Sequence, residues 1–180
     1  MEKPYFDHSD NQNEPAEQIS LEQTRVLAEG GDAEAQFSMG FRLTIEDEGP
    51  AYAQAAQWYS KAAHQNHPLA QFNLGIMYAR GQGMARDSSR SLLWLGRAAQ
   101  LGDAGAQFEL GMRRNRDSMG QNSVLGCETR VEAYKWLLLA AGQGYRAAAN
   151  GCEFVAMGMT HEDVLEGRRR AASFVAGPTQ

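Results

Sequence analysis

Cysteine is scarce in this chain, and its scarcity limits the possible folds. Cys127 and Cys152 are the two cysteines among 180 residues, their surroundings are unrelated, and neither belongs to a Cys-x-x-Cys motif. A small fold held together by a disulfide framework is therefore excluded. We expect both thiols to be reduced, with a disulfide between them as the alternative.

Long apolar runs and an apolar leader are also missing. No run approaches the roughly 18 residues that a membrane-spanning helix needs, and residues 1–7 lack the apolar segment of a secretory signal. We therefore expect a cytoplasmic protein without membrane insertion. The formal charge is −5, and residues 1–34 hold nine acidic but two basic residues. Such an acidic front end disfavours nucleic acid as a partner.

Motifs for catalysis and for metal or phosphate binding are absent as well. The chain has no Ser-x-x-Lys motif, and its four histidines form no His-Glu-x-x-His motif or other close metal-ligand spacing. Gly81 and Gly83 lie between expected helices with no strand before them, which excludes a phosphate-binding loop. We therefore expect no catalytic residues, no cofactor and no metal ligand.

What the chain does have is a repeat. The motif Ala-Gln-Phe-x-Leu/Met-Gly begins at Ala35, Ala70 and Ala106, with spacings of 35 and 36 residues. A period in the thirties indicates stacked helical hairpins, in which each repeat packs only on its neighbours. The tryptophans recur in phase, each four residues before an alanine pair: Trp58, Trp94 and Trp136.

Helix signals divide each repeat into a first and a second helix. Asp87 is placed to cap a helix start, Thr129 and Glu132 form a capping box, and Gly81, Gly102 and Gly144 are typical helix ends. These signals predict first helices at 33–44, 68–79 and 104–116 and second helices at 51–64, 88–101 and 130–143. A further first helix is expected at 146–157, and a last helix from Thr160 with an apolar face that includes Leu165, Phe174 and Val175.

The chain is thus expected to contain one repeat array with atypical ends. Before the array, Ser20 and Gln23 match a capping box that starts a helix. The predicted segments are a flexible acidic arm at 1–17, an N-terminal capping helix at 18–31, repeats at 32–66, 67–102 and 103–144, and a partial fourth repeat with a C-terminal capping helix at 145–180. The third repeat contains a long loop at 115–128.

The middle repeat carries the clearest family pattern. It has Ala70-Gln71, Leu74-Gly75, Tyr78, Gly81-Gln82-Gly83, Asp87, Trp94 and Arg97-Ala98-Ala99. This pattern resembles the Sel1-like repeat family, which is related to tetratricopeptide repeats, over roughly residues 20–157. The resemblance implies an all-α, right-handed α-solenoid of stacked helix–turn–helix repeats. Some members are linked to penicillin binding, but those carry repeating paired cysteines that this chain lacks.

The repeated small residues have a packing explanation. A glycine inside a helix costs up to about 1 kcal/mol relative to alanine, so Gly40, Gly75 and Gly111 predict a close approach of two helices. The alanine pairs are expected to supply the matching small surface, and the tryptophans to fill the wider space. The motif therefore explains stacking, and function is expected on the surface.

By analogy with tetratricopeptide repeats, the first helices are expected to line the concave face. Positions around each Leu/Met-Gly step then predict an apolar groove for a peptide or helix. Burial of the phenylalanines in the core is the alternative. The expected groove residues are Glu34, Phe37, Phe41, Thr44, Leu69, Phe72, Ile76, Ala79, Phe108, Met112 and Asn115.

Three arginines end the third first helix and form a second candidate feature. Arg113, Arg114 and Arg116 could clamp an acidic partner, including this chain's own acidic arm. A solvated helix end that complements the helix dipole is the alternative.

These observations favour a non-enzymatic, protein-binding scaffold that captures a peptide or helix of another protein. A hydrolase related to β-lactam-binding Sel1 proteins and a self-assembling structural protein are the alternatives.

Overall fold

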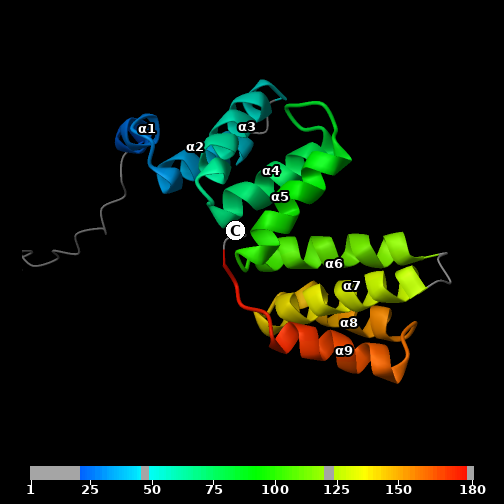
Figure 1. Ribbon diagram of the computed structural model, residues 1–180. Coiled ribbons are helices and arrows are strands. Elements are labelled where there is room, and N and C mark those ends of the chain that lie inside the picture. Colours follow the sequence, from blue (N-terminus) through cyan, green and yellow to red (C-terminus); the bar gives the residue numbers. More distant parts are fainter. Residues whose placement is uncertain (1–20, 46–48, 120–123, 178–180) are drawn as a thin grey trace, which may run out of the picture.

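The computed structural model describes residues 21–45, 49–119 and 124–177, and these residues form nine α-helices and no strand (Figure 1). The all-α solenoid is confirmed. The acidic arm and Ser20 lie outside the described residues. The helices are α1 (Leu21–Glu29), α2 (Ala33–Ile45), α3 (Gly49–His64), α4 (Pro68–Arg80), α5 (Ser88–Gln100), α6 (Ala104–Ser118), α7 (Val124–Gly142), α8 (Arg146–Ala156) and α9 (His161–Ala172).

The helices pack as consecutive hairpins. α2 packs on α3, α4 on α5 and α6 on α7, and the second helix of each hairpin also packs on the first helix of the next. Figure 1 shows the hairpins stacked along the array. At the C-terminal end α9 turns back against α7. There Gly167 allows close contact, since a Cβ on this residue would lie 2.7 Å from the Tyr134 ring.

Several helix signals act as expected. The Asp87 side chain accepts the Arg90 amide over 2.9 Å and caps α5. Thr160 and Asp163 form a capping box at the start of α9. Gly81 ends α4 in the left-handed conformation, with φ of 72°, which glycine adopts without steric cost.

The connection in the third repeat differs from the expected loop at 115–128. α6 continues to Ser118 and α7 begins at Val124, so helix covers most of that range. Thr129 lies inside α7, where its hydroxyl donates to the Leu125 carbonyl over 2.8 Å. This back-bonding is the common alternative to capping for a threonine within a helix, and it explains why the capping-box pattern gave the wrong start.

The mid-helix glycines do mark close approaches, but the alanine pairs are not what they contact. A Cβ on Gly40 would lie 2.8 Å from the ring of Tyr59, and one on Gly75 would lie 2.9 Å from Cγ of Leu95. Gly111 meets Leu137 in the same way, at 2.8 Å. Each glycine therefore makes room for the residue that follows the tryptophan in the second helix.

The glutamine of the motif joins successive repeats. The side-chain amide donates to an alanine carbonyl eight residues earlier, over about 3 Å; in the second and third repeats this is the second alanine of the preceding pair. All three glutamines are buried, so this hydrogen bond satisfies a side-chain amide that water does not reach. The pairs are Gln36 with Ala28, Gln71 with Ala63, and Gln107 with Ala99.

Candidate functional site

The phenylalanines of the repeated motif lie at the junctions between successive first helices. All three are half-buried, which matches the alternative of partial burial in the core more closely than a freely exposed row. Each ring covers the start of the next first helix: Phe37 stacks on His67 with ring centroids 4.7 Å apart, Phe72 covers Gly105, and Phe108 lies 5.1 Å from Tyr145.

Other members of the expected groove are more accessible. Phe41 is 50% exposed and Leu69 is 46% exposed, whereas Ile76 and Met112 are half-buried and pack against the core. Phe41 lines a cavity of about 290 Å³ between α1 and α2, and Ile45, a residue that sequence reasoning did not select, also lines it. The apolar surface is therefore most open at the N-terminal end of the array.

The polar residues of the expected groove largely make contacts within the chain itself. Glu34 is exposed and its carboxylate lies 3.0 Å from Nε2 of His67. The Thr44 hydroxyl donates to the Phe41 carbonyl over 2.6 Å. The apolar Ala79 is half-buried.

Asn115 does not belong to the exposed surface. It is 5% exposed, because α6 continues for another turn beside the extended α7. Its neighbour Ser118 is fully buried and donates to the Asn115 carbonyl over 2.7 Å. Asn115 is therefore removed from the groove residues.

The three arginines of α6 do not point to one place. Successive helical residues are turned by about 100°, so Arg113 and Arg114 diverge. Arg113 is half-buried, whereas Arg114 and Arg116 are exposed. Arg114 faces α5 and α7, where it lines a cavity of about 210 Å³ with Leu92 and Trp136. The geometry therefore favours three separate cations over a single clamp.

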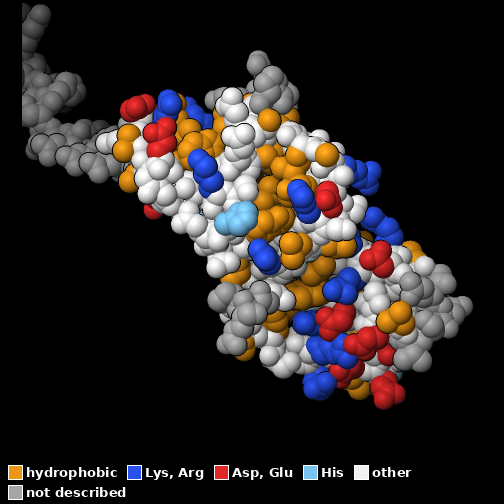
Figure 2. Space-filling view, turned by 45° about the horizontal axis from the view of Figure 1, so that its top comes forward, with side chains coloured by type: hydrophobic (Ala, Val, Ile, Leu, Met, Phe, Trp, Pro, Cys, Tyr) orange, Lys and Arg blue, Asp and Glu red, His pale blue; other side chains and the backbone are white. Residues whose placement is uncertain are grey.

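A tryptophan and a cation recur together on the second helices. Lys61 Nζ lies 4.0 Å from the centre of the Trp58 ring, and the Arg97 guanidinium lies 4.9 Å from that of Trp94. Trp94 and Trp136 are buried, while Trp58 is half-buried. Figure 2 shows one face of the molecule on which hydrophobic side chains form a strip with lysine and arginine beside it. Sequence reasoning treated the tryptophans as packing alone, although Lys61 and Arg97 each follow their tryptophan by three residues; in the third repeat the cation is instead Lys135, which directly precedes Trp136.

The chain after α9 forms a feature that sequence reasoning missed. Residues 174–177, here called the C-terminal strap, leave the helix and return to the middle of the array (Figure 1). The Phe174 ring lies edge-on to Trp136 at 5.4 Å, and the Gly177 amide donates to the Gln100 carbonyl over 2.9 Å. The expected apolar face of the last helix is thus wrong for Phe174 and for Val175, which is 87% exposed.

Ion pairs hold α9 against α7. Arg170 contacts the carboxylates of Glu128, Glu132 and Glu166. Arg169 and Arg170 donate hydrogen bonds to Glu166 and lower its pKa to about 2. In turn Glu128, followed by Glu166 and Glu132, raises the pKa of Arg170 above its usual value. Arg170 therefore joins α9 to α7 through an interhelical contact.

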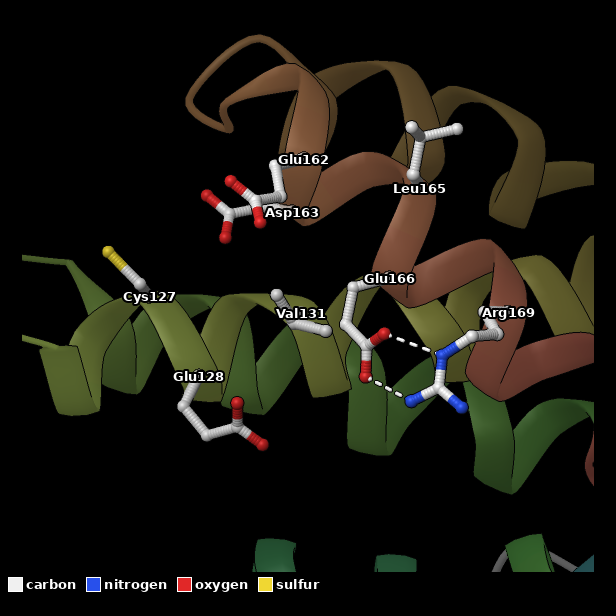
Figure 3. A pocket seen from close by; sticks show the side chains of 8 residues that line it. All are labelled: Cys127, Glu128, Val131, Glu162, Asp163, Leu165, Glu166 and Arg169. Carbon is white, nitrogen blue, oxygen red and sulfur yellow. Dashed lines mark hydrogen bonds and ion pairs between the residues drawn. The ribbon is translucent and has the colours of Figure 1, made fainter.

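A cavity of about 460 Å³ lies beside these ion pairs (Figure 3). Three of the four acidic residues that line it are engaged: Glu128 binds Arg170, Glu166 binds Arg169, and Asp163 accepts hydrogen bonds from Thr160. Cys127 is exposed at its edge, and both cysteines are free thiols.

Within the described ranges, no cluster of three or more His, Cys, Asp and Glu residues is placed to hold a metal ion. In the same ranges, no helix has the length and apolar character needed to cross a membrane.

Comparisons with known proteins agree with this architecture. The family model described as Sel1 repeat matches residues 33–67, 68–103 and 104–145. The crystal structure of a Sel1 repeat protein from Oxalobacter formigenes is 31% identical, with a TM-score of 0.60 over 74% of this chain and 96% of that one. The crystal structure of c5321, a protective antigen of uropathogenic Escherichia coli strains with an SLR fold, is 22% identical with a TM-score of 0.75. The match covers 86% of this chain but 32% of c5321. A search of curated proteins found no match.

Proposed function

Because the chain belongs to the Sel1 repeat family, whose repeats commonly mediate protein–protein interaction, we propose that it is a non-enzymatic scaffold that binds a partner protein on its first-helix face. The bound element is a peptide or helix with an apolar side. The observation that carries this proposal is the exposure of Phe41 and Ile45 at the cavity between α1 and α2, together with the exposure of Leu69 at the start of the next first helix.

The exposure of the groove residues indicates which of them a partner could contact. Large exposed apolar side chains around a cavity are typical of a surface that a partner covers. The half-buried Ile76 and Met112 continue the apolar positions of the first helices along the array. Polar selectivity comes from separate groups, such as Glu34 at the N-terminal end, rather than from an arginine clamp.

The test compares two pairs of exposed apolar residues. Phe41→Ser with Leu69→Ser alters the first-helix face, and Leu92→Ser with Leu93→Ser alters α5, where the two leucines are 39% and 51% exposed. Affinity capture from the source cells, followed by mass spectrometry, should yield a protein that the wild type and the α5 variant retain and the first-helix variant loses.

Folding of both variants is checked by circular dichroism and by the unfolding temperature. The stronger triple change Phe41, Ile76 and Met112→Glu should also abolish capture, but Ile76 and Met112 support the core and the triple variant needs the same folding check. Equal capture by the wild type and the folded first-helix variant would rule out this face as the binding surface.

A further inference from the structure

The C-terminal strap shows how this fold holds an extended segment. Phe174 is the aromatic anchor against Trp136, and Lys135 Nζ lies 4.4 Å from the centre of the tryptophan ring. Three residues later, the Gly177 amide binds the Gln100 carbonyl at the end of α5. One ring contact and one backbone hydrogen bond thus fix the segment across the seam between α5 and α7.

The seam between α1 and α3 contains the same tryptophan and a comparable cation. Trp58 holds in α3 the position that Trp136 holds in α7, four residues before an alanine pair. Lys61 Nζ lies 4.0 Å from the centre of the Trp58 ring, which resembles the placement of Lys135. Trp58 is half-buried, whereas Trp136 under the strap is 5% exposed.

The turn after α1 also matches the turn that holds the strap. Gly31 and Gly102 have left-handed φ values of 101° and 95°. The Glu29 carbonyl is therefore the counterpart of the Gln100 carbonyl that accepts the strap. The amides of residues 30, 31 and 32 donate to the carbonyls of Val26, Ala28 and Leu27, and the amides of residues 101, 102 and 103 donate in the same order to Arg97, Ala99 and Ala98.

The two seams differ in what covers them. A Cβ on Gly102 would lie 3.3 Å from Cβ of Ala176 in the strap, whereas a Cβ on Gly31 would meet no atom of the described residues within 4 Å. Across residues 21–45, 49–119 and 124–177, no aromatic ring packs against Trp58. The seam between α1 and α3 therefore has a tryptophan, a cation and the Glu29 carbonyl in the corresponding places, but no described segment that corresponds to the C-terminal strap.

The seam between α3 and α5 shows that an aromatic cover is the rule in this array. The His64 ring lies edge-on to Trp94 at 5.1 Å, close to the 5.4 Å of Phe174 on Trp136. Glu29 stands at the position of His64 at the end of α1, and its carboxylate is bound to Arg25 over 3.0 Å. The end of α1 therefore supplies no ring that could cover Trp58 in the way that His64 covers Trp94.

We propose that the seam between α1 and α3 binds an extended segment of a partner protein that carries an aromatic residue followed, two and three residues later, by small residues. The aromatic ring lies edge-on to Trp58, a geometry that aromatic pairs favour. The small residues pass over Gly31, and a backbone amide donates to the Glu29 carbonyl. The occupant comes from another protein, because the chain's own strap is held on Trp136 at a high effective concentration.

The experiment uses the full chain labelled with ¹⁵N and a synthetic peptide with the sequence of residues 172–178, blocked at both ends. The indole N–H signals of the three tryptophans are assigned with single Trp→Phe variants. Titration should shift the Trp58 signal saturably. The same peptide with alanine in place of its phenylalanine should bind at least about ten-fold more weakly, since it loses the aromatic pair and its buried area.

Two chain variants test the site from the other side. Trp58→Leu should abolish binding. Lys61→Met leaves the Trp58 ring in place but removes the cation, and should weaken binding. The comparison of the two peptides needs no chain variant, so it decides the question even where Trp58→Leu fails to fold.

Three results would overturn the proposal. The first is a Trp58 signal that does not move at millimolar peptide, or that moves equally with both peptides. The second is a shift of Trp136 alone, which would mean that the peptide displaces the strap. The third is a concentration-dependent dimer that Phe174→Ala dissolves, which would assign the seam to the strap of a second copy.

Discussion

Leu101 interrupts a hydrogen-bond relay that the other repeats complete. In the first repeat, Nε2 of Gln65 donates to Oε1 of Gln36 over 2.9 Å, and in the third repeat Gln143 donates to Gln107 over the same distance. Leu101 stands at this position in the second repeat, two residues after the second alanine of the pair. As a result, Oε1 of Gln71 has no hydrogen-bond partner within the part of the chain that the structure describes, although Gln71 is fully buried.

The change Leu101→Gln is expected to stabilise the chain. A buried acceptor without a partner costs about 1–3 kcal/mol, and the new amide removes this cost. The half-buried leucine gives up part of its apolar contact, which offsets about 1 kcal/mol of the gain. The expected net effect is about 1 kcal/mol, equivalent to an increase of about 2–4 °C in the unfolding temperature of a chain of this size.

Thermal and urea unfolding measure this effect, with two controls. Leu101→Ala removes the leucine without supplying a donor and should lower stability. Gln65→Leu recreates the defect in the first repeat and should cost about 1–3 kcal/mol. If Leu101→Gln is no more stable than Leu101→Ala, the missing hydrogen bond does not limit stability and the reasoning is wrong.

Two further predictions concern the helix contacts. Gly75→Ala should destabilise the chain by about 1–3 kcal/mol, because its Cβ would lie 2.9 Å from Leu95 Cγ and force the two helices apart. Gly96→Ala is the matched change, with no atom within 4 Å of the new Cβ, and it should stabilise α5 by up to about 1 kcal/mol; urea unfolding of the two variants should therefore shift in opposite directions. Glu166 has a pKa of about 2, below its ordinary value of 4.5, because it binds Arg169 and Arg170. Its stabilising contribution is therefore complete above about pH 4.5 and is lost as the pH falls toward 2. The unfolding temperature of the wild type should exceed that of Glu166→Gln at pH 6, and the difference should shrink toward pH 2; a constant difference would contradict the ion-pair explanation.

The stacked fold could be predicted from the sequence because its signals are local and repeat in phase. A glutamine that binds a carbonyl eight residues earlier and a glycine that admits the neighbouring helix recur in every repeat. The start of α7 could not be predicted in the same way, because Thr129 has the pattern of a cap while its hydroxyl binds a carbonyl within the helix.

The surface was predicted less well than the fold. Asn115 follows the spacing of the groove residues, but the length of α6 and α7, which decides its burial, is not visible in that spacing. Arg114 follows Arg113 directly in sequence, yet it is exposed and lines a cavity with residues of α5 and α7, whereas Arg113 is half-buried. The strap depends on a contact between Phe174 and Trp136 that no local pattern announces.

The bond between Gly177 and Gln100 also has a consequence for how the chain folds. Helical arrays are dominated by contacts between near neighbours in sequence, which favours rapid folding. This bond instead joins residues 77 positions apart, so closing it costs more chain entropy than any hairpin in the array. We expect the strap to dock last, after α5 and α7 are in place, and to open first in the native state. The Gly177 amide should accordingly exchange its hydrogen for deuterium faster than the helical amides of α5 beneath it.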